Sequence, residues 1–267
     1  MADGIDGVGA TSPGLRGGPD PDPGIDPDLD PCYKTRLLMG RKALDRLAGS
    51  TVMVVGVGGV GGSCVEALAR GGVGNLVLVD PDRVVPSNMN RQAVAFVQTV
   101  GLPKVEAAAR LVAAVAPHPR VEQVRLRVTA DNASELLDRY APDFVVDAQD
   151  TVAAKLALAS CCEGRGTPLV SAMGTGNKLH PELFEIADIY ETSVCPLCKA
   201  VRKQARGLGI RRMAVLYSKE PPCKVPADEE DRAALGDGRP VGTASWVPPA
   251  AGLMLAGYAM RALAGLE

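Results

Sequence analysis

The chain has 267 residues, a formal net charge of −2, 46% hydrophobic residues and only 3% aromatic residues. Seven cysteines, an odd number in a chain long enough to bury its own core, argue against a disulfide scaffold, and the scarcity of aromatics argues against an all-β sandwich. The sequence has no signal-peptide pattern and no unbroken apolar span, so we expect a soluble, cytoplasmic protein without a membrane span.

Residues 1–32 are expected to form a disordered tail. They are rich in Pro, Gly and Asp and hold almost no large apolar side chains. Seven Asp against one Arg in residues 1–31 give −6, so the total of −2 leaves +4 for the remainder of the chain. A segment of this composition buries too little surface to offset the entropy cost of ordering. Residues 33–267 are predicted to form a single domain.

Strand and helix patterns alternate along most of this domain. The predicted elements are a helix over 35–47, a strand over 51–56, a helix over 60–70, a strand over 75–80, a helix over 104–115, a strand over 121–128, a helix over 131–139, a strand over 143–150, a helix over 152–162 and a strand over 168–173. Asp131 is the expected N-cap of its helix. The alternation predicts an α/β fold, a Rossmann-like doubly wound and mostly parallel sheet with helices on both faces. Residues 177–267 are expected to extend it with a strand, a basic helix and a C-terminal apolar helix.

A glycine-rich loop, VVGVGGVGGS, joins the first strand to the next helix. Gly56, Gly58 and Gly61 fit the pattern G-x-G-x-x-G, and Gly59 is an additional glycine in the loop. Glycines permit a tight turn and let backbone N–H groups approach a phosphate at the helix N-terminus. Asp80 ends the following strand, where a carboxylate can accept hydrogen bonds from ribose hydroxyls. This pattern alone is also compatible with NAD or FAD, or with a turn that binds nothing.

A polar cluster follows in the sequence DPDRVVPSNMNRQ. Its candidate nucleotide contacts are Asp82, Ser87, Asn88, Asn90, Arg91 and Gln92, and Lys104 follows at the start of the next helix. Hydride transfer has no clear need for an Arg and a Lys at the phosphates. Nucleotidyl transfer does, because positioned cations stabilise the charge that develops on the leaving pyrophosphate. We therefore interpret Arg91 and Lys104 as catalytic candidates; the alternative is that each is a solvated surface charge.

The sequence DAQD closes a later strand with Asp147 and Asp150. In an open α/β sheet, the carboxyl ends of the strands face the ligand crevice. A carboxylate there can hold Mg²⁺ against phosphates, and we predict this catalytic role for Asp150. The alternative is that Asp150 caps the helix that begins at Val152, or that the two aspartates divide the two roles.

Together, VVGVGGVGGSCVEALARGGVGNLVLVDPDRVVPSNMNRQ, GLPKVEAA and VVDAQD resemble the ubiquitin-activating-enzyme-like (ThiF/MoeB/HesA-type) superfamily. Within it, TPLVSAMGTGNKLHP and VRKQARGLGIRRMAVLYSKEPP are similar to the tRNA threonylcarbamoyladenosine dehydratases. The resemblance runs from residue 33 to the end of the chain. It implies a homodimeric ATP-binding domain that uses Mg²⁺ and activates a carboxylate as an adenylate. In the dehydratases this is the threonine carboxylate of N6-threonylcarbamoyladenosine, next to the anticodon of tRNA.

The resemblance also implies roles for individual residues. The implied contacts are the nucleotide for Gly59, the ribose for Asp80, the phosphates for residues 87–91 and Lys104, and Mg²⁺ for Asp150. Family members commonly carry an Arg before LLMG that reaches the partner subunit's nucleotide site. Lys34 stands at the matching position here, and Lys keeps the charge but loses the bidentate fork of Arg. Arg36 is the nearby candidate to replace it.

The sequence CPLC places Cys195 and Cys198 in a CxxC pair. The resembling sulfur-carrier adenylyltransferases hold a structural zinc with two such pairs, but no second CxxC follows here. Cys223, His180 and Cys32 are the remaining candidates for a four-ligand zinc site. We favour the simpler interpretation that the segment starts a helix and that the thiols carry no metal.

The basic segment KAVRKQARGLGIRR follows directly. Lys199, Arg202, Lys203 and Arg206 fall at helical positions i, i+3, i+4 and i+7, which places them on one face. This face is a candidate contact for tRNA phosphates. The alternative is a solvated helix face.

The predicted function is the ATP-dependent dehydration of N6-threonylcarbamoyladenosine in tRNA. One alternative is an adenylyltransferase that activates the C-terminal glycine of a ubiquitin-like sulfur carrier, although the second CxxC is missing. Another is an NAD-binding or non-catalytic Rossmann protein, against which Arg91, Lys104 and Asp150 argue together. The expected partners are tRNA and a second copy of the chain, with a sulfur-relay protein as a further candidate.

Overall fold

The computed structural model describes residues 29–226, 228 and 240–266. Most of the expected acidic tail, residues 1–28, therefore lies outside the described residues. The last residues assigned to that tail pack against the domain instead. Asp30 accepts a hydrogen bond from the backbone N–H of Cys32 at 2.9 Å, and Cys32 is buried. The folded domain thus begins a few residues earlier than the composition predicts.

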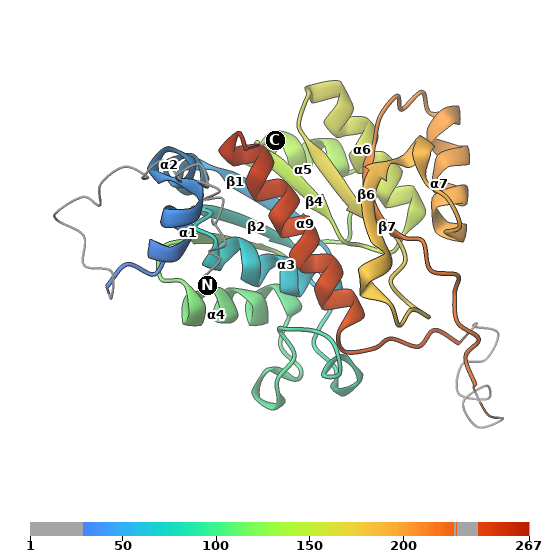
Figure 1. The fold of residues 1–267 in the computed structure, drawn as a ribbon, viewed down its shortest axis with the longest axis horizontal. Coiled ribbons are helices and arrows are strands. Elements are labelled where there is room, and N and C mark those ends of the chain that lie inside the picture. Colours follow the sequence, from blue (N-terminus) through green and yellow to red (C-terminus); the bar gives the residue numbers. More distant parts are fainter. Residues whose placement is uncertain (1–28, 227, 229–239, 267) are drawn as a thin grey trace, which may run out of the picture.

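A seven-stranded sheet forms the centre of the molecule, with strand order β3-β2-β1-β4-β5-β7-β6 (Figure 1). The strands are β1 (Thr51–Val55), β2 (Asn75–Val79), β3 (Arg120–Val124), β4 (Phe144–Asp147), β5 (Leu169–Ala172), β6 (Phe184–Asp188) and β7 (Ala214–Ser218). All neighbours pair in parallel except β6, which runs antiparallel to β7. The predicted mostly parallel α/β fold is confirmed. In β1, the four residues after Thr51 are apolar and buried because helices cover both faces of the sheet.

The helices divide between the two faces of the sheet. They are α1 (Tyr33–Met39), α2 (Arg41–Gly49), α3 (Gly59–Arg70), α4 (Lys104–Val115), α5 (Ala133–Tyr140), α6 (Val152–Arg165), α7 (Pro196–Gly207) and α9 (Val247–Ala264), with short 3₁₀ turns over Pro86–Asn88, Val97–Thr99, Pro181–Leu183 and Ile189–Glu191. One apolar core unites α2, α3, α4 and α9 with the sheet. Two further clusters bury α5, α6 and α7 against the opposite face. None of the described helices is both long enough and apolar enough to cross a bilayer.

Three sequence predictions differ from the observed elements. The helix expected over 35–47 is two helices, because Gly40 takes a positive φ of 82° and turns the chain between them. The strand expected over 121–128 ends at Val124. Asp131 does not cap α5: the N-cap position is Asn132, whose side-chain oxygen instead accepts the backbone N–H of Thr129 at 2.8 Å. That contact helps to shape the loop that follows β3.

The predicted extension contains β6, β7, the basic helix α7 and the apolar helix α9. In Figure 1, α9 runs across α3 on the near face of the sheet. A side chain at Gly252 would overlap the carbonyl oxygen of Val60, so this glycine allows the two helices to cross closely. The same crossing brings Pro248, in the first turn of α9, against the glycine loop at Gly59. The C-terminal extension therefore packs directly against the glycine loop.

Candidate nucleotide site

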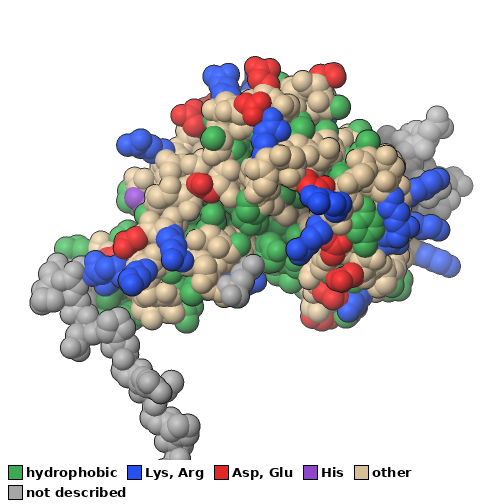
Figure 2. Space-filling view, turned by 90° about the horizontal axis from the view of Figure 1, so that it is seen from above, with side chains coloured by type: hydrophobic (Ala, Val, Ile, Leu, Met, Phe, Trp, Pro, Cys, Tyr) green, Lys and Arg blue, Asp and Glu red, His purple; other side chains and the backbone are tan. Residues whose placement is uncertain are grey.

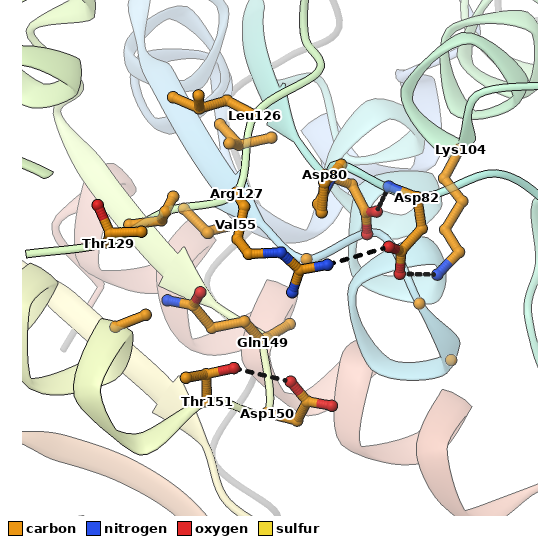
Figure 3. A pocket seen from close by; sticks show the side chains of 18 of the residues that line it. Val55, Asp80, Asp82, Lys104, Leu126, Arg127, Thr129, Gln149, Asp150 and Thr151 are labelled. Atoms are coloured by element: carbon orange, nitrogen blue, oxygen red, sulfur yellow. Dashed lines mark hydrogen bonds and ion pairs between the residues drawn. The ribbon is translucent and has the colours of Figure 1, made fainter. Parts of the chain in front are cut away.

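A cavity of about 450 Å³ opens beyond the carboxyl ends of β1, β2 and β4 (Figure 3). β1 pairs with β2 on one side and with β4 on the other, so the chain reverses its direction of winding at this point. Such a reversal is the usual ligand site of an open α/β sheet. The wall is built from the glycine loop, the residues after β2, the loop after β3 and the loop after β4.

The glycine loop is held in place by close packing. Gly56 has φ of 88°, and a side chain on it would lie 2.8 Å from the carbonyl carbon of Ala148. Gly61 does not line the cavity; a side chain there would overlap the carbonyl oxygen of Gly56, so this glycine lets α3 approach the loop. Gly58 is the N-cap of α3 and supplies no side-chain cap. The first N–H groups of α3 are therefore available to an anion at the cavity.

Asp80 joins the glycine loop to the residues after β2. It is 5% exposed, and its two oxygens accept backbone N–H groups from Val57 at 2.7 Å and from Asp82 at 2.8 Å. A carboxylate oxygen can accept more than one hydrogen bond. Asp80 lines the cavity, so it can hold the loop and still accept hydrogen bonds from a ligand's hydroxyls.

Two cations meet one carboxylate at the cavity wall. The Nζ of Lys104 lies 3.0 Å from one oxygen of Asp82, and a guanidinium nitrogen of Arg127 lies 3.6 Å from the other (Figure 3). Lys104 is buried and begins α4, so its ammonium group is held close to the position shown. Asp82, predicted as a nucleotide contact, thus positions the two cations.

Arg91 lines the cavity from a different direction. Its guanidinium donates to the carbonyl oxygen of Ser87 at 3.0 Å and to the side chain of Asn90 at 2.8 Å. Its stem would be 3.2 Å from a side chain on Gly59, so the Arg packs directly over the glycine loop. Ser87 and Asn90 themselves do not line the cavity; Asn90 donates to the carbonyl oxygen of Thr243 at 3.0 Å. These two predicted contacts therefore act on Arg91 and on the chain before α9.

Asn88 and Gln92 are both buried and both line the cavity. Asn88 accepts the backbone N–H of Val85 at 3.3 Å, which closes the short 3₁₀ turn. The side-chain oxygen of Gln92 is buried without a hydrogen-bond partner among the described residues. A buried acceptor without a donor is costly, so Gln92 is ready to accept a hydrogen bond from a bound ligand.

Asp150 stands exposed at the cavity wall and accepts a hydrogen bond from the hydroxyl of Thr151 at 3.3 Å. The N-cap of α6 is Thr151, so the alternative role of Asp150 as the helix cap is wrong. Within the described part of the chain, Asp150 makes no ion pair with Lys or Arg, and no group of three or more His, Cys, Asp or Glu could cage a metal. One carboxylate beside a phosphate site fits Mg²⁺, which keeps several waters.

Asp147 has no exposed surface and is therefore not a pocket ligand. Its carboxylate lies beneath the loop, 3.1 Å from the Nζ of Lys155 and 2.5 Å from the hydroxyl of Ser171. Asp147 therefore neither caps α6 nor reaches a metal in the cavity, so the predicted division of these two roles between the aspartates is wrong. Asp147 belongs to a buried network that supports the loop from below.

One side of the cavity was not foreseen from the sequence. It consists of Leu126, Arg127, Val128, Thr129 and Ala130 in the loop after β3, together with Gln149 after β4. The pattern VEQVRLRV alternates as a strand would, and nothing in it marks the end of pairing at Val124. Arg127 is the signal that could have been used to predict this side of the cavity, because a strand does not require a cation at an outward-facing position.

Cys195 is the N-cap of α7, and Cys198 lies in its first turn; both thiols are buried and free. A hydrogen bond from the Cys198 thiol, with help from backbone N–H groups, lowers the pKa of Cys195 to about 6. The same contact, together with burial, raises the pKa of Cys198 above its ordinary value. Cys223 approaches Glu220 at 3.5 Å, and the described residues form no zinc-type cluster.

The basic residues of α7 do not share one role. Lys199, Lys203 and Arg206 are exposed. Helix α7 lies at the right of Figure 1, and Figure 2 shows several Lys and Arg side chains on that side of the molecule. Arg202 turns inward, where it donates to the carbonyl oxygen of Thr192 at 2.9 Å and to its hydroxyl at 2.6 Å. Arg202 therefore anchors the turn before α7, although helical spacing places it with the others.

The two cations considered for the partner subunit also differ. Lys34 is exposed, whereas Arg36 is largely buried and forms an ion pair with Asp30 at 3.3 Å. One guanidinium nitrogen of Arg36 is buried without a hydrogen-bond partner in the described residues. Neither side chain lines the cavity of its own chain.

Residues 33–267 match the ThiF family. The tRNA threonylcarbamoyladenosine dehydratase of Bacillus subtilis is 38% identical over 86% of this chain and 93% of that protein. The crystal structure of the Escherichia coli tRNA N6-threonylcarbamoyladenosine dehydratase in complex with ATP superposes with a TM-score of 0.78, at 30% identity, over 88% of this chain and 93% of that chain. The sulfur carrier protein adenylyltransferase of Thermus thermophilus is 36% identical over 54% of this chain and 53% of its own length.

Proposed function

The chain belongs to the ThiF family, and we propose that it is an ATP-dependent tRNA threonylcarbamoyladenosine dehydratase. The observation that carries this proposal is similarity over almost the whole chain, including the C-terminal extension, to proteins of that name. The sulfur-carrier alternative is supported over only about half of the chain. Both enzymes would use the same nucleotide cavity, so the extension distinguishes them.

The groups around the cavity support one orientation for ATP. The N-terminus of α3 receives the phosphates, because its first N–H groups and the glycine loop allow close approach. Asp80 receives the ribose hydroxyls. The apolar side chains of Leu126 and Val128 offer a surface for the adenine ring. Arg91 and Lys104 then lie at the phosphate end of the cavity.

The chemistry follows from this orientation. A carboxylate oxygen of the threonine side group attacks the α-phosphorus, and the bond to pyrophosphate breaks. Arg91 and Lys104 stabilise the charge on the leaving pyrophosphate. A nucleophile of the same nucleoside next attacks the acyl carbon and loses a proton, and AMP leaves with the former carboxylate oxygen. Attack within one molecule has a high effective molarity, so no cysteine nucleophile is required. The nucleoside has then lost the atoms of one water.

Mg²⁺ is part of the proposal. Asp150 would hold it, and the bound ion would neutralise charge on the phosphates during transfer. The fit rests on a carboxylate at the cavity wall that has no competing cation among the described residues. Mg²⁺ that is shared between one carboxylate and phosphates is common in nucleotide enzymes.

We also propose a homodimer. Leu37 and Leu38 on α1 are 60% and 86% exposed, and Phe96 and Val97 are 47% and 72% exposed. Each pair places two exposed apolar side chains next to each other in the chain, and these pairs are our candidates for the interface. In such a dimer, Arg36 or Lys34 would supply a cation to the partner subunit's cavity. Lys34 is exposed, whereas Arg36 is largely buried and paired with Asp30, so exposure supports this role for Lys34 over Arg36.

We propose that tRNA binds the exposed part of α7, at Lys199, Lys203 and Arg206. These side chains can neutralise phosphates at a distance from the cavity. A sulfur-relay protein remains a further candidate partner. A substrate tRNA and ATP are both cytoplasmic, so we place the protein's activity in the cytoplasm.

The deciding experiment incubates the purified protein with Mg-ATP and tRNA that carries threonylcarbamoyladenosine. The tRNA is digested under mild conditions, and its nucleosides are weighed by mass spectrometry. We expect ATP-dependent loss of one water from that nucleoside, with release of AMP and pyrophosphate. An unchanged nucleoside, in a sample where the substrate is present, would contradict the proposal. Candidate sulfur-carrier proteins would then be tested by ATP–pyrophosphate exchange.

A further inference from the structure

Three polar side chains are completely buried beneath the nucleotide cavity. Asp147 ends β4, Lys155 lies in the first turns of α6, and Ser171 lies in β5; each has 0% exposure. The Nζ of Lys155 lies 3.1 Å from Asp147 and 3.1 Å from the hydroxyl of Ser171. The hydroxyl of Ser171 donates to the same oxygen of Asp147 at 2.5 Å. None of the three lines the cavity.

A buried ion pair is a weak explanation of stability. Removal of two charges from water costs much of what their attraction returns, and well-packed apolar side chains often serve as well or better. Nothing in the proposed chemistry uses this pair directly. Its position beneath the loop from Ala148 to Asp150 indicates a different role.

Lys155 contacts both ends of that loop. Its backbone N–H donates to the carbonyl oxygen of Thr151 at 3.0 Å, which closes the first turn of α6 after the loop. Its Nζ holds Asp147, the residue before the loop. The second oxygen of Asp147 accepts the backbone N–H of Gln149 at 3.3 Å, inside the loop. Lys155 therefore contacts both ends of the loop, and its partner Asp147 holds the backbone of Gln149 inside the loop.

The other side of the loop is already fixed. Ala148 donates its N–H to the carbonyl oxygen of Val55 at 2.7 Å and packs on the bare Gly56. These contacts hold Ala148, but they leave Gln149 and Asp150 to be oriented from below. Both of those residues line the cavity, and Figure 3 shows their side chains at the same end of it.

We infer that Lys155 is a positioning residue, which acts through Asp147 to fix Gln149 and Asp150 in the orientation that meets a nucleotide and its cation. The inference rests on the proposed function only in that a nucleotide occupies this cavity. Partners that orient a cation's ligand from behind typically change its affinity or the activity by about 10- to 100-fold when they are removed.

The test separates positioning from support of the fold by comparing two variants. Lys155→Met leaves the Asp147 carboxylate buried and unpaired, so it should unfold at a lower temperature as well as bind nucleotide poorly. The triple variant Lys155→Met, Asp147→Leu and Ser171→Ala removes the whole network and leaves no unpaired charge. We expect the triple variant to recover most of the thermal stability. We expect its affinity for Mg-ATP, measured by calorimetry, to stay about 10-fold or more below that of the native protein.

Two further variants complete the design. Leu158→Ala removes buried packing from the same helix without touching the loop, and it should lower stability while leaving Mg-ATP affinity unchanged. Lys155→Arg keeps a cation that can donate to both Asp147 and Ser171, and it should restore affinity. Hydrogen exchange at the amide of Gln149 should become faster in the Met and triple variants and stay slow in Leu158→Ala.

A triple variant with native Mg-ATP affinity, whatever its thermal stability, would overturn the inference, since the network would then not position the loop. Slow exchange at Gln149 in that variant would overturn it as well. The readouts need no tRNA, so they separate this inference from the proposed function. A native protein that binds Mg-ATP but leaves the tRNA nucleoside unchanged would contradict only the dehydratase proposal.

Discussion

The nucleotide cavity and the exposed face of α7 both present Lys and Arg side chains, but they hold them differently. In the cavity, Lys104 is buried and 3.0 Å from Asp82. On α7, Lys199 and Lys203 are exposed and form no ion pair among the described residues. A cation held at one point can stabilise charge on a particular atom, whereas exposed cations act as a field on a polyanion. The first arrangement suits catalysis, and the second suits attraction of tRNA.

The largest expected effect is at the fixed cation. Lys104→Ala should lower the rate of nucleoside dehydration by about 10²- to 10³-fold, because a positioned charge at the leaving group is lost. Arg110→Ala is the matched control: Arg110 lies on the same helix, but it is exposed and pairs with Glu106 at 2.7 Å. The rate of the control should stay near that of the native protein. A Lys104→Ala protein with native turnover would mean that the cavity cation is not catalytic.

The glycine loop should respond next. A side chain at Gly61 would overlap the carbonyl oxygen of Gly56, so Gly61→Ala should destabilise the fold by about 1–3 kcal/mol and weaken ATP binding. Gly164→Ala adds the same methyl group to α6, where a side chain meets nothing within 4 Å, and it should stabilise slightly. Thermal unfolding with and without ATP measures both. Equal effects of the two substitutions would show that the packing at Gly61 does not matter.

The exposed cations of α7 should act on tRNA alone. Replacing Lys199, Lys203 and Arg206 by Ala should raise the KM for tRNA and make binding less dependent on salt, with a slope reduced by about 0.7–0.9 for each lost phosphate contact. The KM for ATP should not change. Arg202→Gln should instead lower stability, because Arg202 holds the turn at Thr192 at 2.9 Å. An unchanged salt slope in the triple variant would assign the tRNA contact to another surface.

The smallest effect on activity is expected at the buried thiols at the start of α7, whose ionisation acts on stability. Cys195 has a pKa of about 6 in the folded chain against an ordinary value of 9.0, so between these values the unfolded chain binds one more proton. Stability should therefore rise with pH from about 6 to 9 and be lost as the pH falls through 6. Above pH 9 the raised pKa of Cys198 makes the folded chain retain a proton that the unfolded chain releases, so stability should fall again.

Cys195→Ser should flatten the rise between pH 6 and 9, because Ser does not ionise in this range. The measurement is the unfolding temperature of both proteins under reducing conditions, at steps across that range. At each pH, the unfolding temperature of Cys195→Ser is subtracted from that of the native protein. A difference that is the same at pH 6 and 9 would exclude a stabilised thiolate.

Local sequence determined the half of the site that depends on residues close together in the chain. The order of strand, glycine loop and helix predicts Gly56 and Gly58 at the cavity, and the end of the next strand predicts Asp80. The start of a helix predicts Lys104, and the end of β4 predicts Asp150. In each case the parallel sheet brings strand ends to one edge, so chain position alone implies spatial position.

Tertiary structure decided the features that depend on a distant partner. β3 ends at Val124 because the chain turns over the cavity, and Arg202 turns inward because Thr192 lies beneath it. Asp147 and Asp150 are three positions apart in the same short motif. One is buried against Lys155 and Ser171, and the other is exposed at the cavity. The sequence shows two equivalent carboxylates, and only the packing of β5 and α6 around β4 makes one a support and the other a ligand.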